Sequence, residues 1–301
     1  MRTLILGIGA QKAGTTWLFN QLIKAKNYKA GLVKEYNLFN SIYLLHLGEF
    51  NNVKKNIPRR IKNSPFIKTE QQAKQADILL NSFYDDAQNY LNYIDTILNE
   101  DNAITSDISP CYALLPIEAF EFIKTELKKR NIRLKVVFLM REPVSRLESS
   151  IKMKYRRFNK LKHITSKELL VDLNNKIKGL NTLNRGNYQD TFNRLETVFK
   201  HNEVYYGFYE TLFEKQELDR LSNFLNVDID IFNIHQKVNK SGFTFKYKAR
   251  DIKRLKTHAI SQYEFVQEQF GFDIDYWHQA TSNMTQQLNF KEKLAALFNS
   301  Q

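Results

Sequence analysis

Four short apolar segments recur along the chain and alternate with longer stretches in which apolar residues stand three or four positions apart. The short segments are residues 3–9, 103–108, 134–140 and 203–209. Continuous apolar runs of this length are typical of strands that are buried on both faces of a parallel sheet. Their alternation with helical stretches predicts a three-layer α/β fold with a mainly parallel central sheet and right-handed crossovers.

Helical periodicity is clearest over residues 15–26, 76–98, 143–157 and 249–271. Two of these stretches carry boundary signals. Pro143 suits the first turn of a helix, because proline lacks an N–H that would be unpaired there anyway. Gly271 favours a helix stop, because glycine readily adopts the left-handed conformation that ends many helices.

Composition favours one globular domain. The 301 residues include only 10 glycines and 5 prolines, with no repeat or linker, so a single domain over residues 1–301 is expected. The sole cysteine, Cys111, excludes an intramolecular disulfide, and the six histidines lack ligand spacing, so no metal site is expected. No segment resembles a signal peptide or a membrane span, which predicts a cytoplasmic protein.

The net charge of +13 indicates a polyanionic partner, such as nucleic acid, an anionic membrane, an acidic glycan or a phosphate-rich cofactor. Two basic clusters, residues 53–68 and 151–163, carry part of this charge. For both clusters a solvated surface is the alternative interpretation. They contain aromatic residues, but no nucleic-acid fold motif accompanies them, so a nucleic-acid partner is not expected.

The stretch GIGAQKAGTTW follows the first predicted strand and opens a predicted helix. Unpaired N–H groups and the helix dipole make such a helix start a good anion site. Gly9 and Gly14 keep the spacing of a nucleotide-triphosphatase loop, but Thr15 stands where that loop has lysine, and Lys12 lies inside the loop. A P-loop kinase or NTPase is therefore an alternative that the missing lysine disfavours. A turn in which the glycines have only a structural role is another.

Two stretches together resemble a known family. QKAGTTWL resembles the 5′-phosphosulfate loop of sulfotransferases that use PAPS (3′-phosphoadenosine 5′-phosphosulfate). REPVSRLESS, with Arg141 and Ser149, resembles their 3′-phosphate motif. The resemblance covers nearly the whole chain and implies the P-loop NTPase-like sulfotransferase fold. It also implies PAPS as sulfuryl donor, adenosine 3′,5′-bisphosphate (PAP) as product, and no metal.

The resemblance implies a set of residues that bind the nucleotide: Gln11, Lys12, Ala13, Gly14, Thr15, Thr16, Trp17, Arg141, Ser149 and, from a late loop, Lys240 and Gly242. For Trp17, packing in the core is the alternative.

The resemblance also implies residues of the reaction itself. VKEYNLFN matches a family segment whose glutamate is the proposed general base, here Glu35. SDISPCY matches a segment that lines the cleft, here with Asp107 as a second catalytic candidate. Implied acceptor-binding residues are Lys34, Ser109 and Tyr112. Glu35 has the alternative of a surface carboxylate paired with Lys34, and Asp107 that of a structural hydrogen-bond acceptor at a strand end.

These residues suggest an in-line displacement. A sulfuryl group carries one formal charge fewer than a phosphoryl group, so the metal of phosphoryl transfer is not demanded. Lys12 would stabilise charge on the departing phosphate and Glu35 would take the acceptor's proton.

The acceptor is expected to be a hydroxyl or amine of a carbohydrate or small molecule, and the chain's charge suits an acidic one. Because the chain starts at its first core strand with no membrane anchor, a bacterial or viral cytoplasmic enzyme is expected. A non-catalytic nucleotide- or polyanion-binding module is the remaining alternative.

Overall fold

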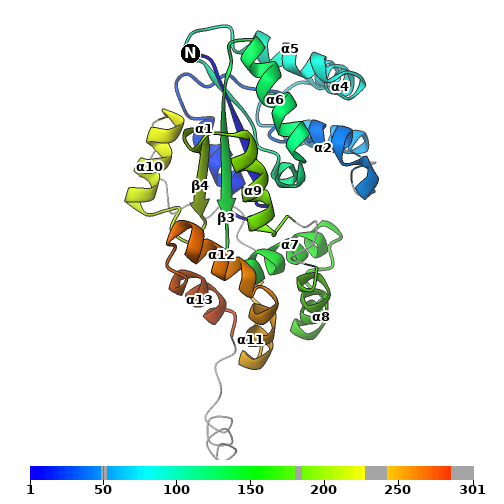
Figure 1. Cartoon of the computed structure of the whole chain (residues 1–301). Helices are drawn as coiled ribbons and strands as arrows, with labels where there is room; N and C mark the ends of the chain where they lie inside the picture. The colour runs from blue at the N-terminus through cyan, green and yellow to red at the C-terminus, as the bar shows by residue number, and fades with distance from the viewer. Residues whose placement is uncertain (49, 51–52, 180–184, 228–242, 286–301) are drawn as a thin grey trace, which may run out of the picture. The chain divides into compact units, whose positions relative to one another are not determined.

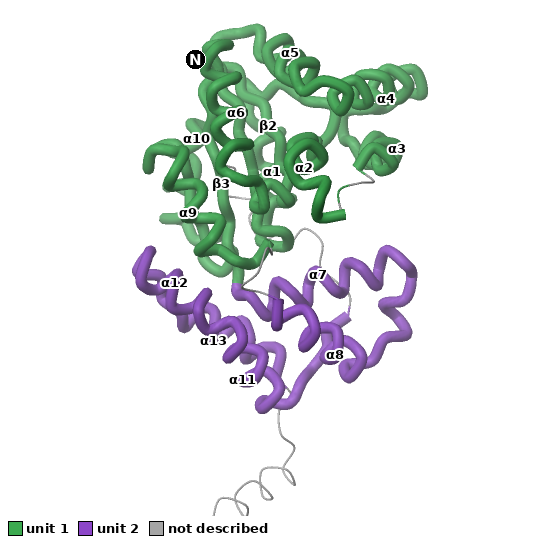
Figure 2. The backbone as a smooth tube through the Cα atoms, turned by 45° about the vertical axis from the view of Figure 1, so that its right-hand side comes forward, with its two compact units in different colours: residues 1–141, 182–240 green, residues 142–181, 241–301 purple. Residues whose placement is uncertain are grey.

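The computed structural model describes residues 1–48, 50, 53–179, 185–227 and 243–285. The chain forms two compact units (Figure 2). Unit 1 consists of residues 1–141 and 182–240, and unit 2 of residues 142–181 and 241–301. The expectation of a single domain over residues 1–301 stays a prediction.

Unit 1 is built on a parallel sheet whose strands lie where the apolar runs predicted them. The strands are β1 (Thr3–Gly9), β2 (Ile104–Asp107), β3 (Arg133–Met140) and β4 (Val204–Phe208). They pair in parallel in the order β2-β1-β3-β4 (Figure 1). Because β1 and β4 are buried along their whole length, their sequences are mainly apolar rather than alternating. β2 is equally buried, but its sequence is Ile-Thr-Ser-Asp, so three of its four buried side chains are polar.

Helices cover both faces of this sheet, which confirms the predicted three-layer α/β class. In Figure 1, α6 (Ile117–Lys129) and α9 (Tyr188–Val198) lie in front of the sheet and α1 (Thr15–Leu22) lies behind it. The other α-helices of unit 1 are α2 (Leu38–Tyr43), α3 (Ile57–Lys62), α4 (Glu70–Asp85), α5 (Ala87–Ile97) and α10 (Lys215–Leu225). Short 3₁₀ turns η1 to η4 occupy Leu45–Leu47, Lys54–Asn56, Pro110–Leu114 and His201–Glu203.

The single helix expected over residues 76–98 was wrong, because the structure has two helices there, α4 and α5. They are separated by Asp86, whose backbone is extended at φ −147° and ψ 123°. The Asp86 carboxylate accepts a hydrogen bond from the Gln88 N–H at 2.8 Å and so caps the start of α5. The apolar periodicity continues across the break, which explains why it was not predicted.

Unit 2 is mainly helical in its described residues. It contains α7 (Pro143–Arg157), α8 (Ser166–Ile177), α11 (Ala249–His258), α12 (Ile260–Phe270) and α13 (Asp275–Ser282). The bounds of α7 are those predicted. The expected helix over residues 249–271 is divided at Ala259, although its predicted stop, Gly271, is confirmed at φ 60°.

The start of α7 is closed by the residue before it. Both carboxylate oxygens of Glu142 accept backbone hydrogen bonds, from Val144 at 2.8 Å and from Ser145 at 2.6 Å. The Tyr263 hydroxyl donates to the same carboxylate at 2.7 Å. The positive end of the α7 dipole is thus already matched by a negative side chain.

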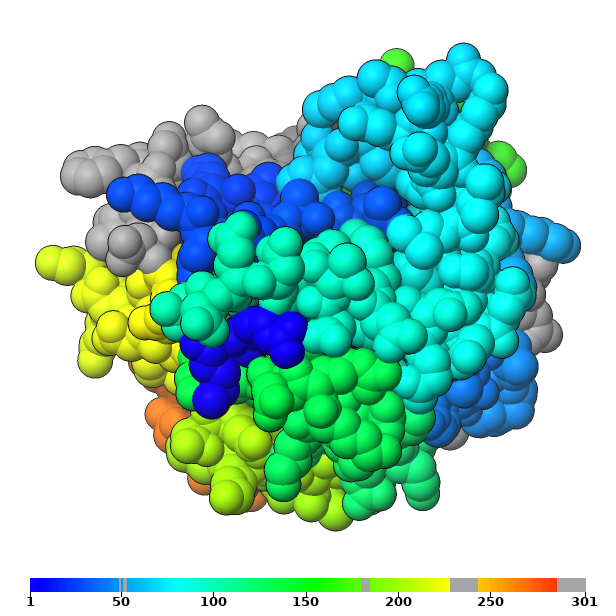
Figure 3. All heavy atoms as spheres, turned by 90° about the horizontal axis from the view of Figure 1, so that it is seen from above, coloured from blue at the N-terminus to red at the C-terminus, as the bar shows by residue number. Residues whose placement is uncertain are grey.

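The amino-terminal end of the sheet is closed by polar contacts of the first residues. Figure 3 looks onto this end, where the start of the chain, in dark blue, lies between segments coloured cyan-green and green. The Met1 ammonium donates to Asn102 Oδ1 at 2.7 Å, and the Arg2 guanidinium pairs with Asp95 at 2.5 Å. The carboxyl ends of the strands lie at the opposite end of the sheet, where ligands of open α/β sheets usually bind.

Within the described residues, two kinds of feature are absent. No helix within those ranges is both long and apolar enough to cross a membrane. The same residues contain no group of three or more histidine, cysteine or carboxylate side chains placed to hold a metal ion.

Candidate functional site

The strand order has a topological switch point between β1 and β3, at the carboxyl ends of these two strands. From β1 the chain runs outward to β2 on one side, and β3 then pairs with the other side of β1. Ligands of open α/β sheets collect at such a switch point, outside the carboxyl ends of the strands. The loop of residues 10–14 follows β1 here, and Arg141 follows β3.

The loop after β1 depends on backbone conformations that favour glycine. Gly14, the residue before α1, has φ 96°. A Cβ atom at Gly14 would also lie 3.0 Å from Leu212 Cδ2 and 3.3 Å from the Tyr209 ring. Lys12 itself is left-handed, with φ 73°. The loop therefore turns sharply into α1, whose first N–H groups have no partner inside the helix and suit an anion.

Arg141 contacts this loop directly, as the sequence interpretation required. Its Nη1 donates to the carbonyl oxygen of Lys12 at 2.9 Å, although the two residues are 129 positions apart. Its Nε is buried and has no hydrogen-bond partner within the described residues. A buried guanidinium N–H without a partner is costly, and a bound phosphate or sulfate oxygen would satisfy it. The geometry therefore fits an anionic group beside the loop.

Two tyrosines that the sequence did not predict hold Arg141 in place. The Tyr188 hydroxyl donates to the Arg141 carbonyl oxygen at 2.6 Å. The guanidinium carbon of Arg141 lies 4.4 Å from the centre of the Tyr209 ring, a cation–π distance. Tyr209 directly follows β4, so its place at the carboxyl edge was a usable signal. Tyr188 gave no such signal.

Glu35 lies in an irregular segment beside the end of β2. Its carboxylate pairs with the Lys34 ammonium at 2.7 Å, and its side chain is 39% exposed. The Ile108 N–H donates to the Lys34 carbonyl oxygen at 2.9 Å, which ties the segment to the residue that follows β2. Glu35 is thus an accessible carboxylate with a cation beside it.

Asp107, the last residue of β2, is fully buried. Its carboxylate accepts four hydrogen bonds, from the backbone N–H of Tyr36 and from the hydroxyls of Tyr90, Ser109 and Tyr112. Burial raises the pKa of Asp107 to about 6, and its hydrogen bonds oppose that rise. A general base needs a lone pair that the substrate can reach. The lone pairs of the Asp107 carboxylate are instead directed at four donors of the protein. This geometry favours the structural alternative for Asp107.

Ser109 and Tyr112, expected near the acceptor, are also fully buried. Besides bonding Asp107, their hydroxyl oxygens accept backbone hydrogen bonds, Ser109 from Asn37 at 3.1 Å and Tyr112 from Leu38 at 3.1 Å. Direct contact with an acceptor would require this network to open.

The segment after β2 also lies close to the start of the loop of residues 10–14. The Pro110 carbonyl oxygen lies 3.1 Å from the position of a Cβ atom at Gly9, the last residue of β1. Residues 107–112 therefore contact both the Glu35 segment and the start of the loop.

The remaining predicted residues fall into four groups. Ser149 lies on α7 in unit 2, and its sharing of an anion with Arg141 stays a prediction. Lys240 and Gly242 lie outside the described residues. Trp17 is only 4% exposed and packs edge-on against Phe213 with 5.4 Å between ring centres, so core packing accounts for it. Within the loop, Gln11 and Thr16 are partly exposed, whereas Ala13 and Thr15 are buried.

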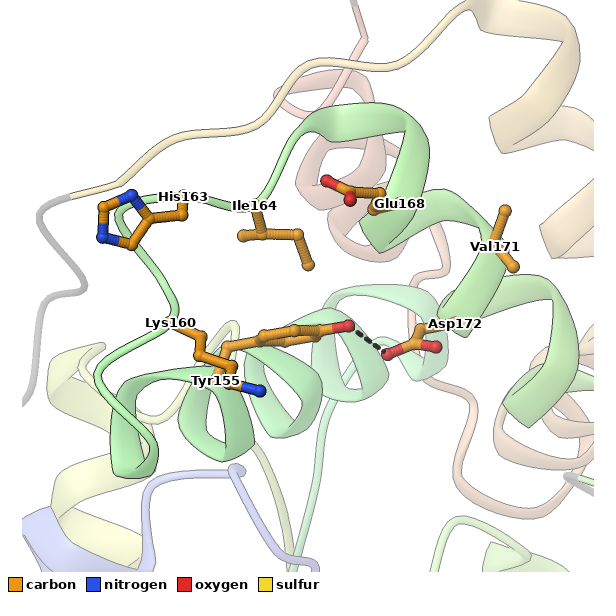
Figure 4. A pocket seen from close by; sticks show the side chains of 7 residues that line it. All are labelled: Tyr155, Lys160, His163, Ile164, Glu168, Val171 and Asp172. Atoms are coloured by element: carbon orange, nitrogen blue, oxygen red, sulfur yellow. Dashed lines mark hydrogen bonds between the residues drawn. The ribbon is translucent and has the colours of Figure 1, made fainter.

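Unit 2 contains an open groove of about 580 Å³ between the end of α7 and α8 (Figure 4). The Tyr155 hydroxyl donates to Asp172 across it at 3.0 Å. Lys160 and His163, from the second basic cluster, line the same groove. Glu168 also lines it, but its carboxylate accepts hydrogen bonds from the N–H and hydroxyl of Thr165 at the start of α8. Part of the second basic cluster therefore lines this groove.

Comparison with known proteins identifies a family. The model of the family described as "Sulfotransferase domain" matches residues 2–288. The sulfotransferase of Alicyclobacillus acidocaldarius has a similar structure, with a TM-score of 0.54 at 16% identity over 92% of this chain and 99% of that one. A sulfotransferase domain from a Synechococcus olefin synthase scores 0.45 at 14% identity over 86% and 94% of the two chains, too low to carry an argument. No curated protein matches. At such identities the first structure shows the fold alone.

Proposed function

This chain belongs to the sulfotransferase domain family, and on that premise we propose that it transfers a sulfuryl group from PAPS to a hydroxyl or amine of an acceptor. The observation that supports the PAPS assignment most is the 2.9 Å hydrogen bond from Arg141 to the Lys12 carbonyl oxygen. It joins two motifs, one for each phosphate of the nucleotide, at the switch point of the sheet.

The nucleotide would be held by two groups of residues. The loop and first turn of α1, residues 11–17, would bind the phosphosulfate through backbone N–H groups. Arg141 would bind the 3′-phosphate with its unpartnered Nε, together with Ser149, and Lys240 and Gly242 are proposed to add to this site. PAPS, when bound, supplies an activated sulfuryl group and a good leaving group.

The chain's own residues would supply the rest of the chemistry. Glu35, which is accessible, would take the proton of the acceptor hydroxyl or amine, a contribution of roughly 10²–10⁴-fold in rate. The Lys12 ammonium would stabilise negative charge on the leaving phosphate oxygen. Lys34, which pairs with Glu35, is the proposed contact with the acceptor beside it.

The acceptor is proposed to be a carbohydrate or a small molecule. An acidic acceptor is proposed because the net charge of +13 favours an anionic partner. A panel of neutral and acidic acceptors of the same size tests this point. A preference for acidic members that weakens with added salt is expected, because exposed charges are screened.

Thermal unfolding with added ligands tests the proposal. PAP without metal should stabilise the protein by about 2.7 kcal/mol at a hundredfold excess over its dissociation constant, whereas ATP with Mg²⁺ should not. Transfer of radiolabelled sulfate from PAPS to the acceptor panel then tests turnover. Stabilisation by ATP with Mg²⁺ in place of PAP would overturn the proposal in favour of a nucleoside-triphosphate enzyme.

A further inference from the structure

The segment that carries Glu35 is irregular, yet the backbone polar groups on either side of Glu35 have hydrogen-bond partners. An irregular buried segment must find partners for its N–H and C=O groups, and here they come from residues that are distant in the chain. The partners lie on two sides, at the end of β2 and on helices α3 and α4.

On the β2 side, the two peptide units that flank the Cα atom of Glu35 are both fixed. The unit before it is held through its carbonyl oxygen, at Lys34, by the Ile108 N–H at 2.9 Å. The unit after it is held through its N–H, at Tyr36, by the Asp107 carboxylate at 3.2 Å. Because peptide units are planar, fixing both planes fixes φ and ψ of Glu35 and so the direction of its Cα–Cβ bond.

On the side of α3 and α4, the carbonyl oxygen of Tyr36 is held by two donors. Arg60, from α3, donates to the Tyr36 carbonyl oxygen through Nη1 at 2.6 Å. The Tyr84 hydroxyl, from α4, donates to the same oxygen. A second nitrogen of Arg60 reaches the Val53 carbonyl oxygen at 2.6 Å. Tyr36 is thus gripped through both its N–H and its C=O.

We propose that Asp107 is a positioning residue for Glu35, which it aims by binding the backbone N–H of Tyr36, while Arg60 and Tyr84 hold the Tyr36 carbonyl from the other side. This inference rests on the proposed role of Glu35 as the base. The carboxylate of Asp107 is fully buried and accepts four hydrogen bonds, so it acts through Glu35 and not on the acceptor itself.

Substitution Asp107→Asn tests the inference. A carboxamide keeps one acceptor oxygen but places an NH₂ group against the hydroxyls of Tyr90 or Tyr112, so the network must rearrange. We expect kcat to fall about 10–100-fold, since a misplacement of about 1 Å has effects of that size. The KM for PAPS and the dissociation constant of PAP should stay within twofold.

A double-mutant cycle separates positioning from general damage. In a Glu35→Gln background there is no base left to aim, so Asp107→Asn should lower the residual rate by less than twofold. Ser106→Ala is the matched control, because Ser106 is the preceding buried β2 residue and its hydroxyl bonds the Tyr28 hydroxyl at 3.0 Å, with no bond to the Glu35 segment among the described residues. Its kcat should match the unsubstituted enzyme within twofold.

Tyr84→Phe is a second test of the inference, which remains available if Asp107→Asn does not fold. It removes one of the two donors to the Tyr36 carbonyl and leaves Arg60 in place. A fall in kcat of a few-fold that disappears in the Glu35→Gln background is expected.

Two results would overturn the inference: an unchanged kcat in Asp107→Asn, or an equal loss of rate with and without Glu35. Absence of any sulfuryl transfer by the unsubstituted enzyme would instead count against the proposed function.

Discussion

Asp107 should make the stability of the protein depend on pH in a direction opposite to that of most carboxylates. The pKa of Asp107 is about 6 in the folded protein, against its ordinary value of 3.8 in an unfolded chain. Between these values the folded state holds a proton that the unfolded state has released. The free energy of unfolding therefore decreases as pH rises through this window, and the loss is complete above about pH 6.

The magnitude follows from the shift of about 2 units, each worth 1.36 kcal/mol, which gives about 3 kcal/mol. Two opposing effects decide it. Burial disfavours the charged carboxylate, and four donated hydrogen bonds favour it, but the net direction is upward. Titratable groups that interact with Asp107 include the phenols of Tyr28, Tyr36, Tyr84, Tyr90 and Tyr112, and burial raises the pKa of each above its usual range. Asp107 alone among them changes charge in this window.

Urea unfolding of the unsubstituted protein and of Asp107→Asn, from pH 4 to pH 7, measures the effect. The asparagine carries no charge, so contributions from other groups cancel in the difference between the two curves. We expect the unsubstituted protein to lose about 3 kcal/mol relative to the variant over this range. Ser106→Ala should show no such pH-dependent difference. A difference curve that is flat, or that rises with pH, would mean that the four donors outweigh burial and would refute the reasoning.

Three further substitutions have definite outcomes. Arg141→Lys should weaken PAP binding at least tenfold by calorimetry, because lysine lacks the fork that reaches both Lys12 and an anion; unchanged affinity would count against this contact. Gly14→Ala should cost about 1–3 kcal/mol in urea unfolding, because it combines φ 96° with a 3.0 Å approach to Leu212; a neutral result would show that the turn adapts. Glu142→Ala should cost about 0.5–2 kcal/mol, since α7 loses its cap, and would be contradicted by unchanged stability.

The strands of the sheet were predictable because burial on both faces leaves a plain signal, a continuous apolar run between polar stretches. The carboxyl-edge placement of Lys12 and Arg141 followed from the parallel order, since each residue comes directly after its strand. Helix breaks were less predictable. The helix is interrupted at a single residue, Asp86. Its capping bond to Gln88 depends on the local backbone conformation, which the apolar periodicity does not indicate.

The sequence predicted which residues lie near Asp107, but not which role Asp107 has. The motif SDISPCY placed Asp107, Ser109 and Tyr112 near the site, and the two roles for Asp107 could not be separated there. What separates them is the arrival of the Tyr36 N–H from 71 residues away, a contact that no pattern within either segment encodes. Burial of the carboxylate is likewise a property of the packed structure and not of the segment.

Charge is the quantity that sequence describes least well, because a count does not distinguish paired cations from free ones. Arg60 belongs to the basic cluster of residues 53–68, yet its donors are used on backbone carbonyls and a tyrosine. On α7 and just after it, Lys154, Arg157 and Lys162 are exposed and form no ion pair within the described residues. Both clusters keep exposed cations without an ion pair in the described part of the chain, since Lys55, Arg59 and Lys62 of the first cluster are also exposed, so salt should weaken association of an anionic partner with either one.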